Sequence, residues 1–475
     1  VKSDEEYRER MKEKVERNIA ETQAKLDKIV GSPLNVKSSP QCQAYFYGTL
    51  GNRAFTKYNK ETKKSAQTTD AKAMAKLAVG TKIREPIYEA ELVLNIRKNR
   101  DNISRFLNMK LDHDNRFRCV FNPRGTKTGR LSSSKNINGV GGNLQNLPHS
   151  FRGFLIADEG KIIITIDKKQ AEWVVSAFAS GDENMIKIVQ SGIDAHATSG
   201  SLICSLPIEY VFLEDSYTSK SRDSDEIEEA RKLLDKEHPE WKRETLLEKY
   251  PGSWLPRRFS IRQLGKHSNH GWNYDMSSNR FMEEYETSFE EADLARKRYR
   301  YIAYPGIPAW HRKIQSILLG KLVDEGFEPR VLINPYGRRR VFYGELDDDT
   351  FREAYNFIPQ STVADNINDG ITKTYFDEAE ELRDYEFLIQ CHDESVGQFP
   401  IGNLSSSPHV FSGNVKTSNM NSKSRGGSLT FLTKLLLAST GGIQSRSKTS
   451  HLQWQSRGNS PKLSGMQERN KRRQR

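Results

Sequence analysis

Residues 387–399 read FLIQCHDESVGQF, and this stretch predicts the centre of the fold. Two apolar segments flank the polar triplet 392–394, which is the pattern of a β-hairpin with carboxylates at its tip. Far upstream, the β-branched run IIITI at 162–166 ends abruptly at Asp167, so a second buried strand also delivers an acid to its end. Carboxylates on two strand ends favour a pair of divalent cations about 3.5–4 Å apart, an arrangement suited to phosphoryl or nucleotidyl transfer.

A cationic helix face is expected between these two strands. Residues 262–274 read RQLGKHSNHGWNY, so Arg262, Lys266, His270 and Tyr274 recur every four residues along one face of a helix. A nucleoside triphosphate needs this polarity, with cations against its phosphates and planar side chains near its base and sugar. A solvated basic helix face is the plainer alternative for this segment taken alone.

Several segments, in the same order along the chain, resemble the family A DNA polymerases, the bacterial DNA polymerase I family. TGRLSSS at 128–134 and NLQNLP at 143–148 are similar to the family's template–primer signature. Residues 167–182 look like motif A, 262–274 like motif B and 392–394 like motif C. YGRRR at 336–340, followed by Arg352, Asn356 and Gln360, resembles the stretch between motifs B and C. The resemblance covers about residues 1–400.

The resemblance implies an α+β right-hand fold with palm, fingers and thumb and a mostly antiparallel palm sheet. The expected divisions are a thumb with the entry to the palm at 1–127, the first part of the palm at 128–184 and the fingers at 185–345. Residues 346–400 would return from the fingers to the palm and carry motif C. Within the fingers, a charged insertion near 214–256 is expected to form an extra helical pair, either as a solvated surface or as a docking site.

The resemblance also implies a template-directed DNA polymerase that extends a primer 3′-hydroxyl with deoxyribonucleotides and releases pyrophosphate. Two Mg²⁺ ions, or Mn²⁺ in their place, would bind Asp167 and Asp393, with Glu394 beside them and Lys266 assisting the chemistry. The nucleotide would meet a set of side chains from motifs A and B: Gln170, Glu172, Arg262, Lys266, His270 and Tyr274. Primer–template DNA would contact a second polar set: Arg130, Asn143, Gln145, Arg352, Asn356, Gln360 and His392.

Two departures from the family pattern concern the nucleotide. The position usually held by Phe or Tyr in motif B is His270, and the family's Tyr-Gly is here Tyr274-Asp275. Motif A carries lysines at 168 and 169, where small or aromatic residues are commoner. A histidine can still stack on a base, so nucleotide binding is expected with altered discrimination.

The net charge of +12 resides entirely in the last 75 residues. Residues 401–475 hold 13 Lys or Arg and one acidic residue, while the basic and acidic residues of 1–400 cancel. DNA binding by the body must therefore come from local basic patches. The Ser-rich tail is either a disordered basic arm or the product of a lost reading frame after Pro400, and we favour the second because 429–437 are apolar. The chain is expected to be a fragment at both ends.

Other signals set the expected partners and place of action. Beyond DNA and deoxyribonucleotides, replisome proteins are candidate partners, and a phage or viral monomer is expected. Four widely separated cysteines and the lack of a signal or membrane-spanning pattern favour the cytoplasm or nucleoid over secretion or a membrane. The alternatives are a catalytically idle DNA-binding or scaffold protein with an incomplete palm, and a single-subunit RNA polymerase.

Overall fold

The centre of the protein is a four-stranded sheet. The computed structural model describes residues 1–59, 62–79, 86–168, 170–219, 221, 224–257, 259–285, 287–376, 384–391, 394–401 and 415–418. The strands are β7 (Lys161–Asp167), β10 (Glu386–Cys391), β11 (Glu394–Pro400) and β12 (Val415–Ser418), in the order β10-β11-β7-β12. Every pairing in this sheet is antiparallel, which confirms the predicted hairpin, the predicted upstream strand and the sheet type.

One face of the sheet is buried by the segments that precede it in the chain. Ile163, Ile389 and Val396 come from three different strands and pack into one apolar cluster with Phe106 and Phe154. The central strand β7 is buried at four of its seven positions, which explains its β-branched composition. The sheet is thereby held rigid, and its strand ends have fixed positions.

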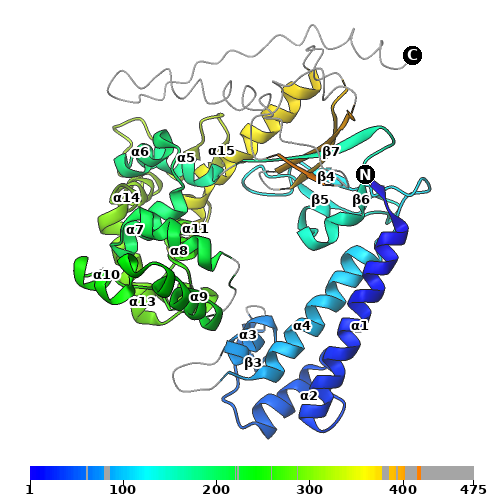
Figure 1. Cartoon of the computed structure of the whole chain (residues 1–475). Helices are drawn as coiled ribbons and strands as arrows, with labels where there is room; N and C mark the ends of the chain where they lie inside the picture. The colour runs from blue at the N-terminus through cyan, green and yellow to red at the C-terminus, as the bar shows by residue number, and fades with distance from the viewer. Residues whose placement is uncertain are drawn as a thin grey trace, which may run out of the picture.

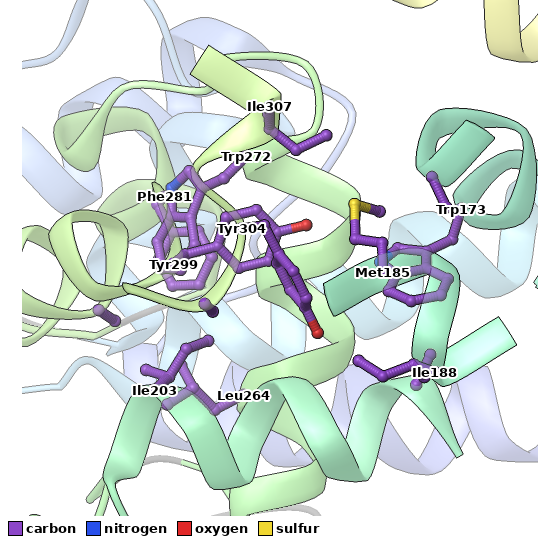
Figure 2. Close-up of a cluster of buried hydrophobic side chains, with 14 of the residues drawn as sticks. Trp173, Met185, Ile188, Ile203, Leu264, Trp272, Phe281, Tyr299, Tyr304 and Ile307 are labelled. Carbon is purple, nitrogen blue, oxygen red and sulfur yellow. The ribbon is translucent and has the colours of Figure 1, made fainter. Parts of the chain in front are cut away.

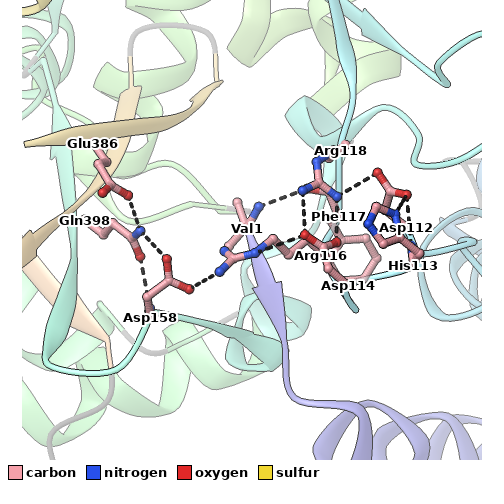
Figure 3. A network of polar contacts seen from close by, with 10 residues as sticks. All are labelled: Val1, Asp112, His113, Asp114, Arg116, Phe117, Arg118, Asp158, Glu386 and Gln398. Atoms are coloured by element: carbon pink, nitrogen blue, oxygen red, sulfur yellow. Dashed lines mark hydrogen bonds and ion pairs between the residues drawn. The ribbon is translucent and has the colours of Figure 1, made fainter. Parts of the chain in front are cut away.

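The first residues of the chain are tied to this sheet by polar contacts. The Val1 nitrogen donates to the Phe117 carbonyl at 2.9 Å, and β1 (Lys2–Ser3) pairs with β6 (Leu155–Ile156). Asp158, just after β6, pairs with Arg116 at 2.5 Å and accepts from Gln398 of β11 at 2.9 Å (Figure 3). These contacts fix the start of the first long helix relative to the sheet.

A long helical arm extends away from the sheet (Figure 1). It is built on α1 (Glu5–Val30) and α4 (Tyr88–Asn102), which pack against each other. Asp4 caps the start of α1 by accepting from the Tyr7 amide at 2.9 Å, and Gly31 ends it in the left-handed conformation. The apolar side chains of α1 fall into two groups: those of its first half pack on the sheet cluster, and those of its second half pack on a separate cluster around Leu26 in the arm.

The remainder forms a helical body with an aromatic core. Trp272 stacks on Phe281 with ring centroids 4.5 Å apart, and Tyr299 contacts both Trp272 and Tyr304 (Figure 2). Trp173 meets Tyr304 edge-on at 5.9 Å, which joins the helix that follows β7 to this core. The sheet and the helical body therefore have fixed positions relative to each other at this point.

The closest helix pair in the body is α7 (Ala195–Cys204) against α11 (Ile261–Trp272). Their backbones approach at two glycines: a Cβ added to Gly265 would lie 2.0 Å from the His196 carbonyl oxygen, and one on Gly200 would lie 2.3 Å from the Ile261 carbonyl oxygen. α11 begins with a capping box formed by Ser260 and Gln263. The predicted motif B helix is thus confirmed, although Tyr274 lies just beyond its end.

The other elements fall into two groups by position along the chain. Elements before β7 are α2 (Ser39–Gln43), η1 (Ala44–Thr49), β2 (Thr56–Asn59), β3 (Lys64–Gln67), α3 (Ala71–Val79), η2 (Ile103–Leu107), β4 (Val120–Asn122), β5 (Ser132–Ser134), η3 (Leu144–Asn146) and η4 (His149–Phe154). Those after it are α5 (Ala171–Ser180), α6 (Glu183–Ser191), α8 (Ile208–Thr218), α9 (Ser224–Glu237), η5 (Pro239–Trp241), α10 (Arg243–Lys249), α12 (Ser278–Tyr285), α13 (Phe289–Arg298), η6 (Tyr299–Ala303), α14 (Gly306–Leu318), β8 (Val331–Ile333), β9 (Arg339–Val341) and α15 (Asp348–Phe376).

Helices α9 and α10 confirm the helical pair predicted within 214–256. The sequence pattern did not predict β12, which adds a fourth strand to the sheet from within the tail. The apolar patch at 429–437 lies outside the described residues. Among the helices with described positions, none combines the length and the apolar character that a membrane span requires.

Substitution of Gly265 by Ala is expected to lower the free energy of unfolding by about 1–3 kcal/mol, because the new methyl group meets backbone atoms that cannot move aside. Chemical denaturation of the full chain measures this change. Gly48→Ala is the matched control, since a Cβ there would meet nothing within 4 Å. Equal stability of the two variants would contradict the close α7–α11 contact.

Candidate active site

Two acidic residues meet at one edge of the sheet. Asp167 is the last residue of β7, Glu394 is the first residue of β11, and the two are paired directly across the antiparallel ladder. Cys391 at the end of β10 pairs with the same Glu394, so residues 392 and 393 connect two strand ends that are already side by side. His392 and Asp393 themselves lie outside the described residues. The fold thus brings Asp167, Glu394 and both chain neighbours of the 392–393 pair to one place.

The charge of Glu394 is compensated by Arg152, a residue that the sequence analysis missed. Arg152 lies in η4 and its Nη1 contacts Glu394 Oε1 at 2.7 Å, with both side chains largely buried. Burial opposes the charge of Arg152, but the hydrogen bond to Glu394 and the negative charges of Glu394 and Asp167 outweigh it and raise the pKa of Arg152. No motif marks this arginine, because its partner is 242 residues away in the sequence.

The donor chemistry at this edge fits a hard divalent cation. Asp167 is exposed at the strand end, and carboxylate oxygens are the ligands that Mg²⁺ prefers. Within the described ranges, no group of three or more His, Cys, Asp or Glu side chains gathers to form a closed metal cage. An open site with one or two carboxylates is the arrangement expected for Mg²⁺ that also binds phosphate groups of a substrate.

A second polar cluster lies close to Asp167 in the sequence and joins three segments. Gln170 takes the left-handed conformation, φ 55°, and α5 starts directly after it. Glu172, in the first turn of α5, accepts from the Tyr274 hydroxyl at 2.5 Å and forms an ion pair with Arg130. Burial, then the charge and hydrogen bond of Glu172, raise the pKa of Tyr274 well above its usual range. Tyr274 is therefore a neutral donor, and its hydrogen bond joins the segment after α11 to the first turn of α5.

The residue after Tyr274 explains how a departure from the family pattern is accommodated. Asp275 has φ 58°, in the left-handed region that favours glycine. Its carboxylate pairs with Arg296 at 2.8 Å and also with Arg300, and its carbonyl accepts from Arg352 at 3.3 Å. Asp tolerates this conformation better than most residues, and the ionic contacts hold it there.

The cationic face of α11 is present as predicted. Lys266 and His270 are exposed on α11, whereas Arg262 is engaged by Asp194 at 3.0 Å and by Asp215 at 3.8 Å. His196 of α7 packs against this helix, since a Cβ on Gly265 would lie 2.0 Å from its carbonyl oxygen. A hydrogen bond between Asn269 Nδ2 and His196 Nδ1 at 3.0 Å also joins α11 to α7.

Several of the side chains predicted to contact DNA form hydrogen bonds to neighbouring segments of the protein. Asn143 accepts from the Ser133 hydroxyl at 2.8 Å, and Gln145 donates to the Leu131 carbonyl at 2.9 Å. These bonds fix the loop that carries Arg130. Three further members of the set form a row on α15, where Asn356 donates to the Arg352 carbonyl at 2.7 Å and Gln360 donates to Asn356 at 3.3 Å.

Contacts between distant segments bring these two groups together. Asn368 of α15 donates to the Gly129 carbonyl at 3.4 Å, and Lys127 pairs with Glu353 at 3.2 Å. A Cβ on Gly129 would collide with the guanidinium of Arg338, which is itself bound to Asp365. The loop that carries Arg130 therefore lies against α15, which brings together the described members of the predicted DNA-contacting set. The remaining member, His392, lies outside the described residues.

The chain is similar in sequence to known DNA polymerases. Residues 5–221 match DNA polymerase family A. The chain is also 27% identical over 417 residues to the thermostable DNA polymerase I of Thermus aquaticus and 26% identical over 420 residues to that of Thermus thermophilus. These alignments cover 84% of this chain but 41% of each relative, so the chain spans about two fifths of their length.

A solved structure supports the fold. The POL domain of Pol1 from M. smegmatis, in complex with DNA primer-template and dNTP, superposes with a TM-score of 0.64 at 21% identity, covering 86% of this chain and 62% of that one. The predicted α+β right-hand fold is therefore confirmed. The named relatives are bacterial and give no support to the phage or viral origin expected from the sequence.

His196 lies within residues 5–221, which match DNA polymerase family A, and its ionisation can be followed directly. Burial, aided by the neighbouring cations, lowers the pKa of His196 to about 4. Its ring is expected to stay neutral from pH 8 to about 5, as followed by NMR of its C2 proton, with His196→Gln used to assign the signal. Because this pKa is below that of an unfolded histidine, the contribution to stability is complete above about pH 6.5 and is lost as the pH falls toward 4. A titration midpoint near neutrality would contradict this environment.

Proposed function

We propose that this chain is a template-directed DNA polymerase of family A that adds deoxyribonucleoside monophosphates to a primer 3′-hydroxyl and releases pyrophosphate. One observation carries the proposal: Asp167 lies directly opposite Glu394 at a strand end, and Cys391, the residue before the 392–393 pair, is paired with the same Glu394. The similarity of residues 5–221 to family A and of the fold to a POL domain bound to DNA and dNTP supports it.

In this proposal, the three parts of the fold take the roles of a right hand. The arm and the segment to residue 127 form the thumb, and residues 128–184 contribute the first part of the palm. Residues 185–345 form the fingers, which include the helical pair near 214–256. Residues 346–400 return to the palm and supply motif C, and β12 extends the palm sheet by one strand.

Two Mg²⁺ ions, or Mn²⁺, would be held by Asp167 and Asp393 and would activate the primer hydroxyl and stabilise the leaving pyrophosphate. Glu394 stays fixed beside them through its ion pair with Arg152, so the excess negative charge of the acids is partly balanced before any cation binds. That balance reduces repulsion between carboxylates that must lie close together.

The incoming nucleotide would lie along the exposed face of α11. Arg262 and Lys266 would bind the phosphates. His270 would stack near the base, and Gln170 would contact the nucleotide at the start of α5. Lys266 would also neutralise charge that moves to the leaving pyrophosphate.

Sugar selection would depend on the Glu172–Tyr274 pair. The hydrogen bond from Tyr274 and the ion pair with Arg130 hold the Glu172 side chain in one position, where it would block a ribose 2′-hydroxyl. A fixed group discriminates better than a mobile one, because it cannot move aside without losing two partners.

Primer–template DNA would pass over the surface formed by the Arg130 loop and α15. Family A enzymes read minor-groove acceptors that are shared by all four base pairs, so such contacts would test pair geometry without reading sequence. The proposed set is the one expected from the sequence: Arg130, Asn143, Gln145, Arg352, Asn356, Gln360 and His392. Other replication proteins remain proposed partners, and a monomer acting in the cytoplasm or nucleoid is the proposed form.

Substitution of Asp167 by Asn is expected to reduce primer extension by about 10³-fold, because a carboxylate that binds the metal ions becomes a neutral amide. The assay uses a primed template, Mg²⁺ and all four deoxyribonucleotides. Asp393→Ala is expected to have a comparable effect, whereas Asp101→Asn, on the exposed surface of α4, is the matched control. No extension by a folded wild-type protein that binds primed DNA would support the idle scaffold alternative.

Substitution of Glu172 by Ala is expected to reduce discrimination against ribonucleotides by about 10- to 100-fold, because the block at the 2′ position is removed. Single-nucleotide incorporation kinetics with matched ribo- and deoxyribonucleotides give the ratio of kcat/KM values. Glu183→Ala, exposed at the start of α6, serves as the control. Unchanged discrimination would exclude Glu172 as the selecting group.

A further inference from the structure

A buried ion pair fixes α8 against the start of α11. Glu214 of α8 is fully buried, and its Oε1 accepts from Arg231 Nε at 2.7 Å while its Oε2 accepts from the Ile261 amide at 2.8 Å. Arg231 of α9 also donates to the carbonyls of Pro256 at 2.7 Å and Phe259 at 3.0 Å. Removing either partner would leave an uncompensated buried charge, so α8, α9 and the entry to α11 behave as one rigid unit.

The next residue, Asp215, faces the cationic side of α11. Its Oδ2 lies 3.8 Å from Arg262 Nε, while Asp194 Oδ2 lies 3.0 Å from Arg262 Nη2. Two carboxylates thus share one guanidinium. Asp194 also accepts from the backbone amides of His196 and Ala197 as the cap of α7, so it has a structural task of its own. Asp215, by contrast, forms an ion pair with Arg262 and does not cap α7.

The carboxylate of Asp215 is expected to repel a second anion that approaches Arg262. Its side chain is 26% exposed, and burial followed by the charge of Asp194 raises the pKa of Asp215, against the opposing effect of Arg262. A triphosphate that approaches Arg262 meets the same partly buried carboxylate, and charges in such a setting are screened less than in water. Binding must therefore displace or share the contact that Asp215 makes.

We propose that Asp215 is a counter-ion that competes with the nucleotide triphosphate for Arg262, so that the α8–α9 unit lowers nucleotide affinity. The inference rests on the proposed function and adds a residue that sets affinity without belonging to the reacting centre. Asp215 acts through Arg262, which makes it a positioning residue. The position of α8 is fixed by the Glu214–Arg231 pair, so the backbone that carries Asp215 keeps this carboxylate close to Arg262.

The test is nucleotide binding by the full chain with a primer–template whose primer ends in a dideoxynucleotide, so that no chemistry follows. Asp215→Asn is expected to bind the correct deoxyribonucleoside triphosphate about three- to tenfold more tightly than wild type. In primer extension, the KM for the nucleotide is expected to fall by the same factor with kcat changed by less than about twofold. Asp215→Glu, which keeps the charge, is expected to bind like wild type.

Two controls separate this effect from a change in net charge or in structure. Glu229→Gln makes the same charge change on the exposed surface of α9 and is expected to leave affinity unchanged. In an Arg262→Ala background, Asp215→Asn is expected to have less than about a twofold effect, because the contested partner is gone. An effect of equal size in both backgrounds, or wild-type affinity for Asp215→Asn, would overturn the inference. Absence of nucleotide binding by the wild type would instead refute the proposed function.

Discussion

The antiparallel pairing of β7 with β11 is the constraint on which the rest of the structure depends. It sets Asp167 opposite Glu394, and it brings the ends of β10 and β11 to the same edge. A shift of one residue in this register would turn every side chain of a strand to the opposite face. The apolar cluster formed by Ile163, Ile389 and Val396 opposes such a shift, since it would expose all three. Burial on one face therefore fixes the positions of the acids on the edge.

Acids that are held together need compensating charge, and the structure provides it from segments distant in sequence. Arg152 neutralises Glu394, while Arg130 and Tyr274 restrain Glu172. On α11 the relation is reversed, because Arg262 is partly balanced by Asp194 and Asp215, while Lys266 and His270 are exposed. The strand ends and α11 thus both carry charged side chains that are held by partners of opposite sign from distant segments.

The helical body holds the cationic side of α11 in a fixed position. Gly200 and Gly265 let α7 and α11 approach to backbone contact, which places His196 beside α11. The stacked Trp272 and Phe281 bury the opposite side of α11. Because one side of this helix is packed, its polar side, which carries Arg262, Lys266 and His270, is presented in a single orientation.

The sequence by itself determined the strand that ends at Asp167, the hairpin around 392–394, the helix that carries Arg262 and Lys266, and the α+β class. These features are local, because a run of β-branched residues or a four-residue spacing indicates a strand or a helix within a few residues of sequence. Only the tertiary structure decided that Arg152 pairs with Glu394, that Asp215 faces Arg262, that His196 packs against α11 and that Val415–Ser418 adds a strand to the sheet. Each of these depends on contacts between segments far apart in the chain, and no local pattern in the sequence records such a contact.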